Sequence, residues 1–208
     1  MQKSGRGACR CELAPGPGLP GAAEVMALMA RLRGRELLSA WLRYFLGATL
    51  YASKPGTLLS VGEACGLAPA WRAHGPECVR RLGLEFRVMH SCRDAQCVLF
   101  YRPAALRGFL ALANNAAYLR ECGYGGLDLN ACLDRLSRRF AGGCPHELGV
   151  FLGIPAAEVR AFSSPFRPAA KAAGYWQVFV DLKNSLEKFA EYDTAFRRAC
   201  REVLECAA

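Results

Sequence analysis

The sequence predicts an α+β fold: a small mixed sheet of about three to four strands packed with helices, and long amphipathic helices near both ends. Three observations support this prediction. Apolar residues recur at helical spacing over residues 22–53 and again over 182–203. Two short segments between them, 84–90 and 97–101, are typical of strands. The chain of 208 residues is 52% hydrophobic, which suffices for a substantial core and excludes wholesale disorder.

We expect residues 1–21 to form a disordered leader, because proline and glycine alternate there. The leader has no apolar stretch before a cleavage site, so it does not resemble a secretory signal. Residues 22–208 are predicted to form a single α+β domain. Met26 and Met29 are alternatives to Met1 as the natural start.

The periodicity of residues 22–53 predicts one amphipathic helix, with Gly34 and Gly47 as candidate break points. Lys54-Pro55-Gly56 then stops the helix. A strand or buried turn is expected at Thr57–Val61. A helix is weakly indicated at Pro69–Leu82.

The two strand candidates in the middle of the chain differ in pattern. Leu84–His90 alternates, which places Val88 and His90 on one face of a strand. Cys97–Tyr101 is apolar throughout, as expected of a strand that is covered on both faces. Ser91–Gln96 between them suits a hairpin loop.

The second half of the chain is predicted to be mostly helical. Tyr175–Val180 is the exception, because its aromatic and β-branched residues favour a strand. Asp181 is expected to cap the last helix. The other helices are expected at Pro103–Cys122, Leu127–Phe140, Pro145–Leu152 and Ala156–Phe162. The inward residues of the last helix are predicted to be Leu182, Leu186, Phe189, Phe196, Cys200 and Val203.

The charge and composition of the chain do not favour a membrane or a nucleic acid as its partner. The formal net charge is +9, but 22 of the 27 basic residues are arginines in an alanine- and glycine-rich chain, and they form no continuous block. A nucleic-acid partner is therefore unlikely on the sequence, since binders concentrate cations on one stripe. No uncharged apolar run approaches the ~20 residues of a membrane-spanning helix.

The 11 cysteines show no metal-binding pattern, because no pair is spaced C-x-x-C and no zinc-finger arrangement occurs. No metal site is predicted. Without an export signal we expect a cytoplasmic protein with reduced thiols. Phosphate-binding loops, dinucleotide fingerprints and nucleophile elbows are also missing from the sequence, and the residues indicate no cofactor.

The segment from Cys144 to Gly153 holds the densest group of candidate functional residues. Pro145 suits the first position of a helix, and Glu147 suits its first turn, where the helix dipole favours an anion. His146 would then act as a base or ligand, with Glu147 orienting it. The alternative is that both residues are structural caps.

Further candidates lie at the ends of predicted elements, where clefts commonly form. Tyr175 is a third catalytic candidate, after His146 and Glu147. The candidates for ligand binding are Lys54, Tyr101, Arg102, Trp176 and Asp181. We expect five of these polar side chains to converge at one edge of the sheet: Lys54, Arg102, His146, Glu147 and Tyr175.

Four segments together resemble an uncharacterised bacterial family, domain of unknown function 3793: Lys54–Ser60, Val98–Arg102, Pro145–Pro155, and Gly174–Phe179 followed by Asp181. The resemblance extends from about Trp41 to the last helix. It implies a soluble cytoplasmic protein associated with iron or redox metabolism. Lys171-Ala172-Ala173 stands where the resemblance implies cysteines, so a metal site built on that segment is not expected here.

Three hypotheses on function follow. The first is an intracellular enzyme or cofactor-handling protein with a polar cleft of His, Glu, Tyr and Arg. The second is a non-catalytic binding or regulatory module that docks a redox or iron-metabolism protein through a helix face. The third, nucleic-acid binding through the basic half, is the least favoured. Substrate, reaction and oligomeric state do not follow from the residues.

Overall fold

The computed structural model describes residues 20–63, 66–93 and 95–206, so most of the predicted leader lies outside the described residues. Its central feature is a three-stranded sheet of β1 (Gly56–Gly62), β2 (Glu85–Ser91) and β3 (Ala95–Tyr101). The strand order is β1-β3-β2 and both pairings are antiparallel. The α+β class is confirmed. The sheet is antiparallel rather than mixed, because β3 forms a hairpin with β2 and also pairs antiparallel with β1.

The central strand β3 is covered on both faces, as its apolar run predicts. Val98 and Phe100 point into one hydrophobic cluster, while Leu99 and Tyr101 point into another. Strand β2 departs from simple alternation, because its pairing shifts register after Val88. The shift buries Met89 and leaves His90 exposed, contrary to the predicted face.

Three helices precede the sheet in the chain: α1 (Ala22–Met29), α2 (Gly34–Phe45) and α3 (Gly47–Tyr51). The single helix expected here is broken at both candidate glycines. Gly34 has a positive φ of 52°, and a Cβ on Gly47 would lie 3.0 Å from the Ala199 Cβ of the last helix. Helices α1, α2 and α4 (Leu67–Arg81) cover the sheet face that carries Phe100.

The opposite face carries a second group of helices: α5 (Pro103–Leu110), α6 (Ala113–Glu121), α7 (Leu129–Arg139), the 3-10 turn η2 (Phe140–Gly142), α8 (Leu148–Phe151) and α9 (Ala156–Ser163). The helix predicted over 103–122 is two helices, because Leu112 adopts an extended ψ of 135°. Buried Asn115 stabilises the break by donating to Phe109 O and accepting from Ala156 N.

The strand predicted at Tyr175–Val180 is confirmed only over two residues. A short hairpin stands there, with β4 (Ala172–Ala173) paired to β5 (Gln177–Val178) and a turn over residues 174–176. Tertiary packing explains the difference. A Cβ on Gly174 would lie 2.4 Å from a Phe189 ring atom, so the turn packs closely on the last helix.

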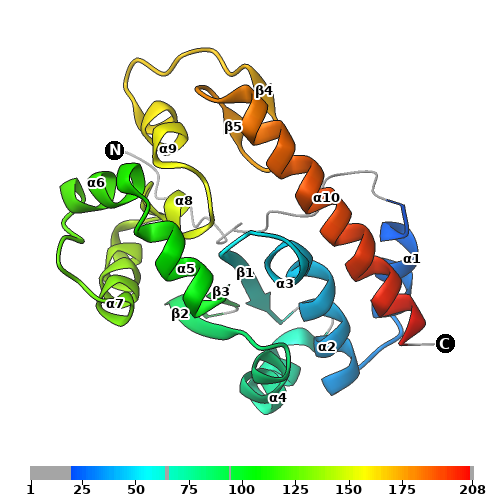
Figure 1. The fold of residues 1–208 in the computed structure, drawn as a ribbon. Coiled ribbons are helices and arrows are strands. Elements are labelled where there is room, and N and C mark those ends of the chain that lie inside the picture. Colours follow the sequence, from blue (N-terminus) through cyan, green and yellow to red (C-terminus); the bar gives the residue numbers. More distant parts are fainter. Residues whose placement is uncertain (1–19, 64–65, 94, 207–208) are drawn as a thin grey trace, which may run out of the picture.

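The last helix, α10 (Leu182–Glu205), crosses the molecule beside α3 (Figure 1). Asp181 caps it as predicted, since its side chain accepts from Asn184 N at 3.0 Å. Phe189, Phe196 and later inward residues are buried. Leu182 and Leu186 are 37% and 48% exposed, contrary to prediction, because the first turns of α10 project beyond α3.

Buried Glu158 of α9 connects the hairpin to α10. Its carboxylate accepts from three successive backbone N–H groups, those of Phe179 (2.6 Å), Val180 (3.1 Å) and Asp181 (2.8 Å). The side chain is 2% exposed. Hydrogen bonds to an ionised acceptor are stronger than neutral ones, so this residue determines where α10 begins.

We predict that Glu158→Gln destabilises the protein by about 2–4 kcal/mol, because one amide group would then present N–H donors to backbone N–H donors. Chemical denaturation would measure the loss. Glu187→Gln, which changes an exposed carboxylate on α10, is the matched control and should stay within about 0.5 kcal/mol of wild type. Equal stability of the two variants would contradict this role of Glu158.

Candidate functional site

A cavity of about 470 Å³ lies between α10, the start of α9 and the turn that precedes β1. We call it the motif cavity, because three of the segments that carry the family resemblance meet at its wall. These segments contribute Pro55, Gly153 with Pro155, and Trp176. The cavity is lined by Ser53, Pro55, Phe109, Leu112, Ala113, Asn114, Asn115, Gly153, Pro155, Ala156, Ala157, Trp176, Asn184, Lys188 and Tyr192.

Two turns pack directly on each other at the base of this cavity. Gly153 has a φ of 88°, and a Cβ at this position would lie 2.6 Å from Pro55 Cδ. Only glycine combines the left-handed backbone with so close an approach. Arg102 N donates to Pro55 O at 3.0 Å, which attaches the same turn to the end of β3.

Trp176 forms a side wall of the cavity from the hairpin turn. Its ring lies 4.6 Å from the Phe189 ring and 6.4 Å from the Tyr192 ring, between centroids. The indole Nε1 is buried and has no hydrogen-bond partner among the described residues. Neighbouring Tyr175 donates its hydroxyl to Asp193 at 2.7 Å and stacks on Phe196. Tyr175 is therefore a support of this wall.

One polar network links α10 to the turn before β1. Lys188 Nζ donates to Ser53 Oγ and to Glu191 Oε2, both at 2.8 Å. Ser53 donates its backbone N–H to Glu191 Oε1 at 2.6 Å and its hydroxyl to Oε2 at 3.0 Å. A serine beside a lysine amine also occurs in hydrolases, where the amine is neutral. Here the lysine is ion-paired to Glu191, so the contacts indicate a structural connection and not an activated nucleophile.

Lys54 lies behind Tyr192 and is 4% exposed. Its Nζ is 5.9 Å from the centre of the Tyr192 ring, and no carboxylate among the described residues pairs with it. Burial lowers the pKa of Lys54 to about 8. Burial also raises the pKa of Tyr192 well above its ordinary value, so its hydroxyl stays neutral. A buried cation without a partner is costly and marks a site worth testing for function.

Arg102 lies next to this lysine. Its Nη2 donates to Ala52 O at 2.5 Å and is 3.5 Å from Lys54 O. The Nε is buried without a partner in the described part of the chain. Thus Lys54 and Arg102, which the sequence analysis selected together, are neighbours, and contacts through Tyr192 connect them to Tyr175 and Trp176.

His146 and Glu147 do not join this group, so the expectation that all five side chains converge is wrong. Helix α8 begins after Glu147, which leaves His146 in an exposed turn with its ring 5.9 Å from Phe162. The first-turn dipole argument therefore does not apply to them. Buried Glu147 forms an ion pair with Arg139 and accepts from Tyr124 at 3.1 Å. These contacts tie α8 to α7.

Two other candidates have structural partners. Tyr101 points into the core from the end of β3, and its hydroxyl donates to Glu85 at 3.1 Å. Burial, with a smaller effect of Glu85, raises the pKa of Tyr101 to about 12. Asp181 caps α10, as described above. Neither lines the motif cavity.

The cavity residues of α10 were not among the candidates predicted from the sequence. Asn184, Lys188 and Tyr192 are spaced four apart and therefore share one face of the helix. That spacing was a usable signal. The apolar periodicity of this helix predicts only its core-facing side and does not reveal a polar stripe that ends in a buried tyrosine.

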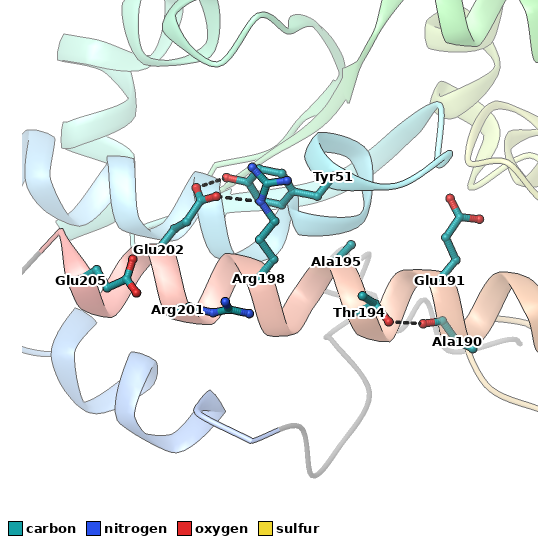
Figure 2. A pocket seen from close by; sticks show the side chains of 9 residues that line it. All are labelled: Tyr51, Ala190, Glu191, Thr194, Ala195, Arg198, Arg201, Glu202 and Glu205. Carbon is teal, nitrogen blue, oxygen red and sulfur yellow. Dashed lines mark hydrogen bonds and ion pairs between the residues drawn. The ribbon is translucent and has the colours of Figure 1, made fainter.

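A second groove, of about 780 Å³, runs along the outer side of α10 (Figure 2). Its central groups satisfy one another: Glu202 accepts from Tyr51, Arg43 and Arg198, and Arg198 also lies over the Tyr51 ring at 4.3 Å. Although burial opposes the shift, these hydrogen bonds lower the pKa of Glu202. We interpret this groove as a structural ion network between α3, α2 and α10.

Among the described residues, no group of three or more His, Cys, Asp and Glu side chains is arranged to hold a metal ion. No disulfide joins the cysteines of residues 66–93 and 95–206. In the same part of the molecule, no helix combines the length and the apolar character that a bilayer crossing requires.

The comparisons with known proteins confirm the family resemblance. The family described as a protein of unknown function (DUF3793) matches residues 42–208, so the chain belongs to this family. No curated protein and no solved structure is significantly similar to it.

We predict that Lys54→Met stabilises the protein at pH 7, by on the order of 3 kcal/mol, because it removes a buried charge that has no carboxylate partner among the described residues. The pKa of Lys54 is about 8 in the folded protein and 10.5 in the unfolded chain, so the unfolded chain binds more protons between these values. The free energy of unfolding of the wild-type protein should therefore rise as the pH rises from 8 to 10.5, until the cost of the buried charge is recovered.

The measurement is the free energy of unfolding of both proteins at pH 7 and at several higher values. Other groups titrate in the same range, so the difference between the two proteins is the informative quantity. It should shrink as the pH rises. A variant that is less stable than wild type at pH 7, or a difference that does not change with pH, would contradict the assignment.

Proposed function

We propose that the protein binds a small organic molecule with an apolar ring in the motif cavity, as a cofactor-handling protein or an enzyme. The observation that carries this proposal is the meeting of three separate resemblance-bearing segments at one cavity. Pro55, Gly153 and Trp176 are far apart in the chain, and each contributes to the same wall. Core packing alone does not require such segments to surround an open space.

The composition of the wall supports a ring-shaped ligand. Phe109, Leu112 and Trp176 provide apolar and aromatic surface, whereas Asn114 and Asn184 provide amides. Pockets for small molecules commonly combine a mainly apolar lining with a few polar groups that fix orientation. Leu112 is 53% exposed, so apolar surface also extends toward solvent.

The proposal assigns binding and not a reaction. His146 and Glu147 have other contacts, so this site uses neither of them as a catalytic residue. The association with iron or redox metabolism, the bacterial origin and the cytoplasmic location stay predictions.

One observation favours a second candidate function, docking of a protein partner. Val180, Leu182 and Leu186 are 50%, 37% and 48% exposed and lie together at the start of α10. Exposed apolar residues in one place often mark an interaction surface. Leu186→Lys separates the two functions, because it should disrupt docking of a partner and leave small-molecule binding unchanged.

The fluorescent probe N-phenylnaphthylamine, a neutral amine that joins a naphthalene to a phenyl ring, tests the proposed function. We predict that one probe binds per protein molecule with micromolar affinity, measured by fluorescence titration. Ala157→Phe should weaken binding at least about tenfold, because the added ring occupies the cavity. Ala157 is exposed and lines the cavity, so its replacement should not disturb the core.

The matched control is Ala104→Phe, which adds the same ring to an exposed position on α5 away from the cavity. It should bind the probe like wild type. Failure of the folded wild-type protein to bind, or equal weakening by the two substitutions, would contradict the proposed site.

A further inference from the structure

We propose that the ligand of the motif cavity carries an anionic group, a carboxylate or a phosphate, attached to its ring. This inference rests on the proposed function, because it names the chemical class that the same cavity selects. It is carried by the distribution of charge around the cavity, which comes from three separate elements of the fold.

Three cations lie in or beside the wall of the cavity. Lys188 of α10 lines it, Lys54 lies behind the lining Tyr192 ring, and Arg102 donates its backbone N–H to the lining Pro55. The carboxylates nearby already accept hydrogen bonds. Glu191 is held by Lys188 and Ser53, Asp193 accepts the hydroxyl of Tyr175, and Glu158 accepts from the backbone that precedes α10.

Neither Lys54 nor Arg102 has a carboxylate partner among residues 20–63, 66–93 and 95–206. Arg102 binds only backbone carbonyl groups there. Buried charges are normally paired, and an unpaired one raises the energy of the folded protein. An anion in the adjacent cavity would compensate the buried Lys54 ammonium and the half-buried Arg102 guanidinium, and their partial removal from water would keep the attraction from being fully screened by salt.

Lys188 is the cation that can touch the ligand. An ammonium group has three N–H donors, and the contacts to Ser53 and Glu191 use two of them. The third is left for a ligand, because Lys188 lines the cavity. Lys54 does not line the cavity, so its effect is electrostatic and acts past the Tyr192 ring.

A cationic ligand fits this site poorly. Both oxygens of Glu191 already accept hydrogen bonds, Oε1 from Ser53 N and Oε2 from Ser53 Oγ and Lys188. The Glu191 carboxylate that a cation would seek is therefore already engaged, whereas Lys54 and Arg102 have no carboxylate partner among the described residues. The cavity thus selects for the sign of the ligand as well as for its ring.

The test is displacement of N-phenylnaphthylamine by three naphthalenes that differ in one substituent: naphthoate, naphthyl phosphate and the neutral naphthalenemethanol. We expect at least one anion to bind about tenfold more tightly than the alcohol. Comparison of the two anions identifies carboxylate or phosphate as the preferred group. The tighter binding of the anion relative to the alcohol should persist in part at high salt.

Lys54→Met should reduce the ratio of anion to alcohol affinity about threefold or more, and Lys188→Met should reduce it further. Lys183→Met removes an exposed lysine of α10 that does not line the cavity, and it should leave the ratio unchanged. Circular dichroism would confirm that each variant is folded. Two charge variants with different roles keep the test decisive if one of them misfolds.

The outcomes are distinguishable. If N-phenylnaphthylamine binds but neither anion exceeds the alcohol, the inference on charge is wrong and the proposed function stands. The inference is also wrong if Lys183→Met alone lowers the ratio, because the attraction then belongs to the general surface charge. If the probe does not bind at all, the proposed function and the inference both fail.

Discussion

The hydrogen bonds from three consecutive backbone N–H groups to the buried Glu158 carboxylate are the constraint on which the site depends. They join α9 to the hairpin and determine where α10 starts. That junction places Trp176 on one side of the motif cavity and Lys188 on another. A neutral side chain could not satisfy the same donors as well, because charge-assisted bonds are about twice as strong as neutral ones. The carboxylate is thus used to build the cavity and is not itself part of the lining.

A second constraint is the close contact between Gly153 and Pro55. It attaches the helical layer of α8 and α9 to the turn before β1 and so buries Lys54 at the edge of the sheet. The fold thereby holds a positive charge where an apolar side chain would be more stable. Proteins commonly accept such a loss of stability at sites of function. The same reasoning separates Glu147 from the site, because its charge is matched by Arg139 and Tyr124.

Local pattern predicted the regular elements well. The covered strand β3, helices α7 and α9, and the Asp181 cap of α10 all follow from periodicity and capping chemistry within a few residues of chain. Of the five side chains expected to converge, Lys54, Arg102 and Tyr175 lie around Tyr192, whereas His146 and Glu147 do not. Predictions failed where distant residues decide the backbone. Leu112 breaks a helix because Asn115 bonds to Ala156, and the Tyr175 segment turns because Phe189 packs against Gly174.

The fold class, the family and most helices can be predicted from the residues alone, because the spacing of apolar residues and the chemistry of helix ends are local properties. Which polar residues share a site depends on how distant segments pack together. That packing separated His146 and Glu147 from Lys54 and Arg102, and it brought in Lys188 and Tyr192 from α10. The physical reason is that a site is assembled by contacts between segments more than 100 residues apart, such as Ser53 with Lys188, and no local pattern encodes their distance.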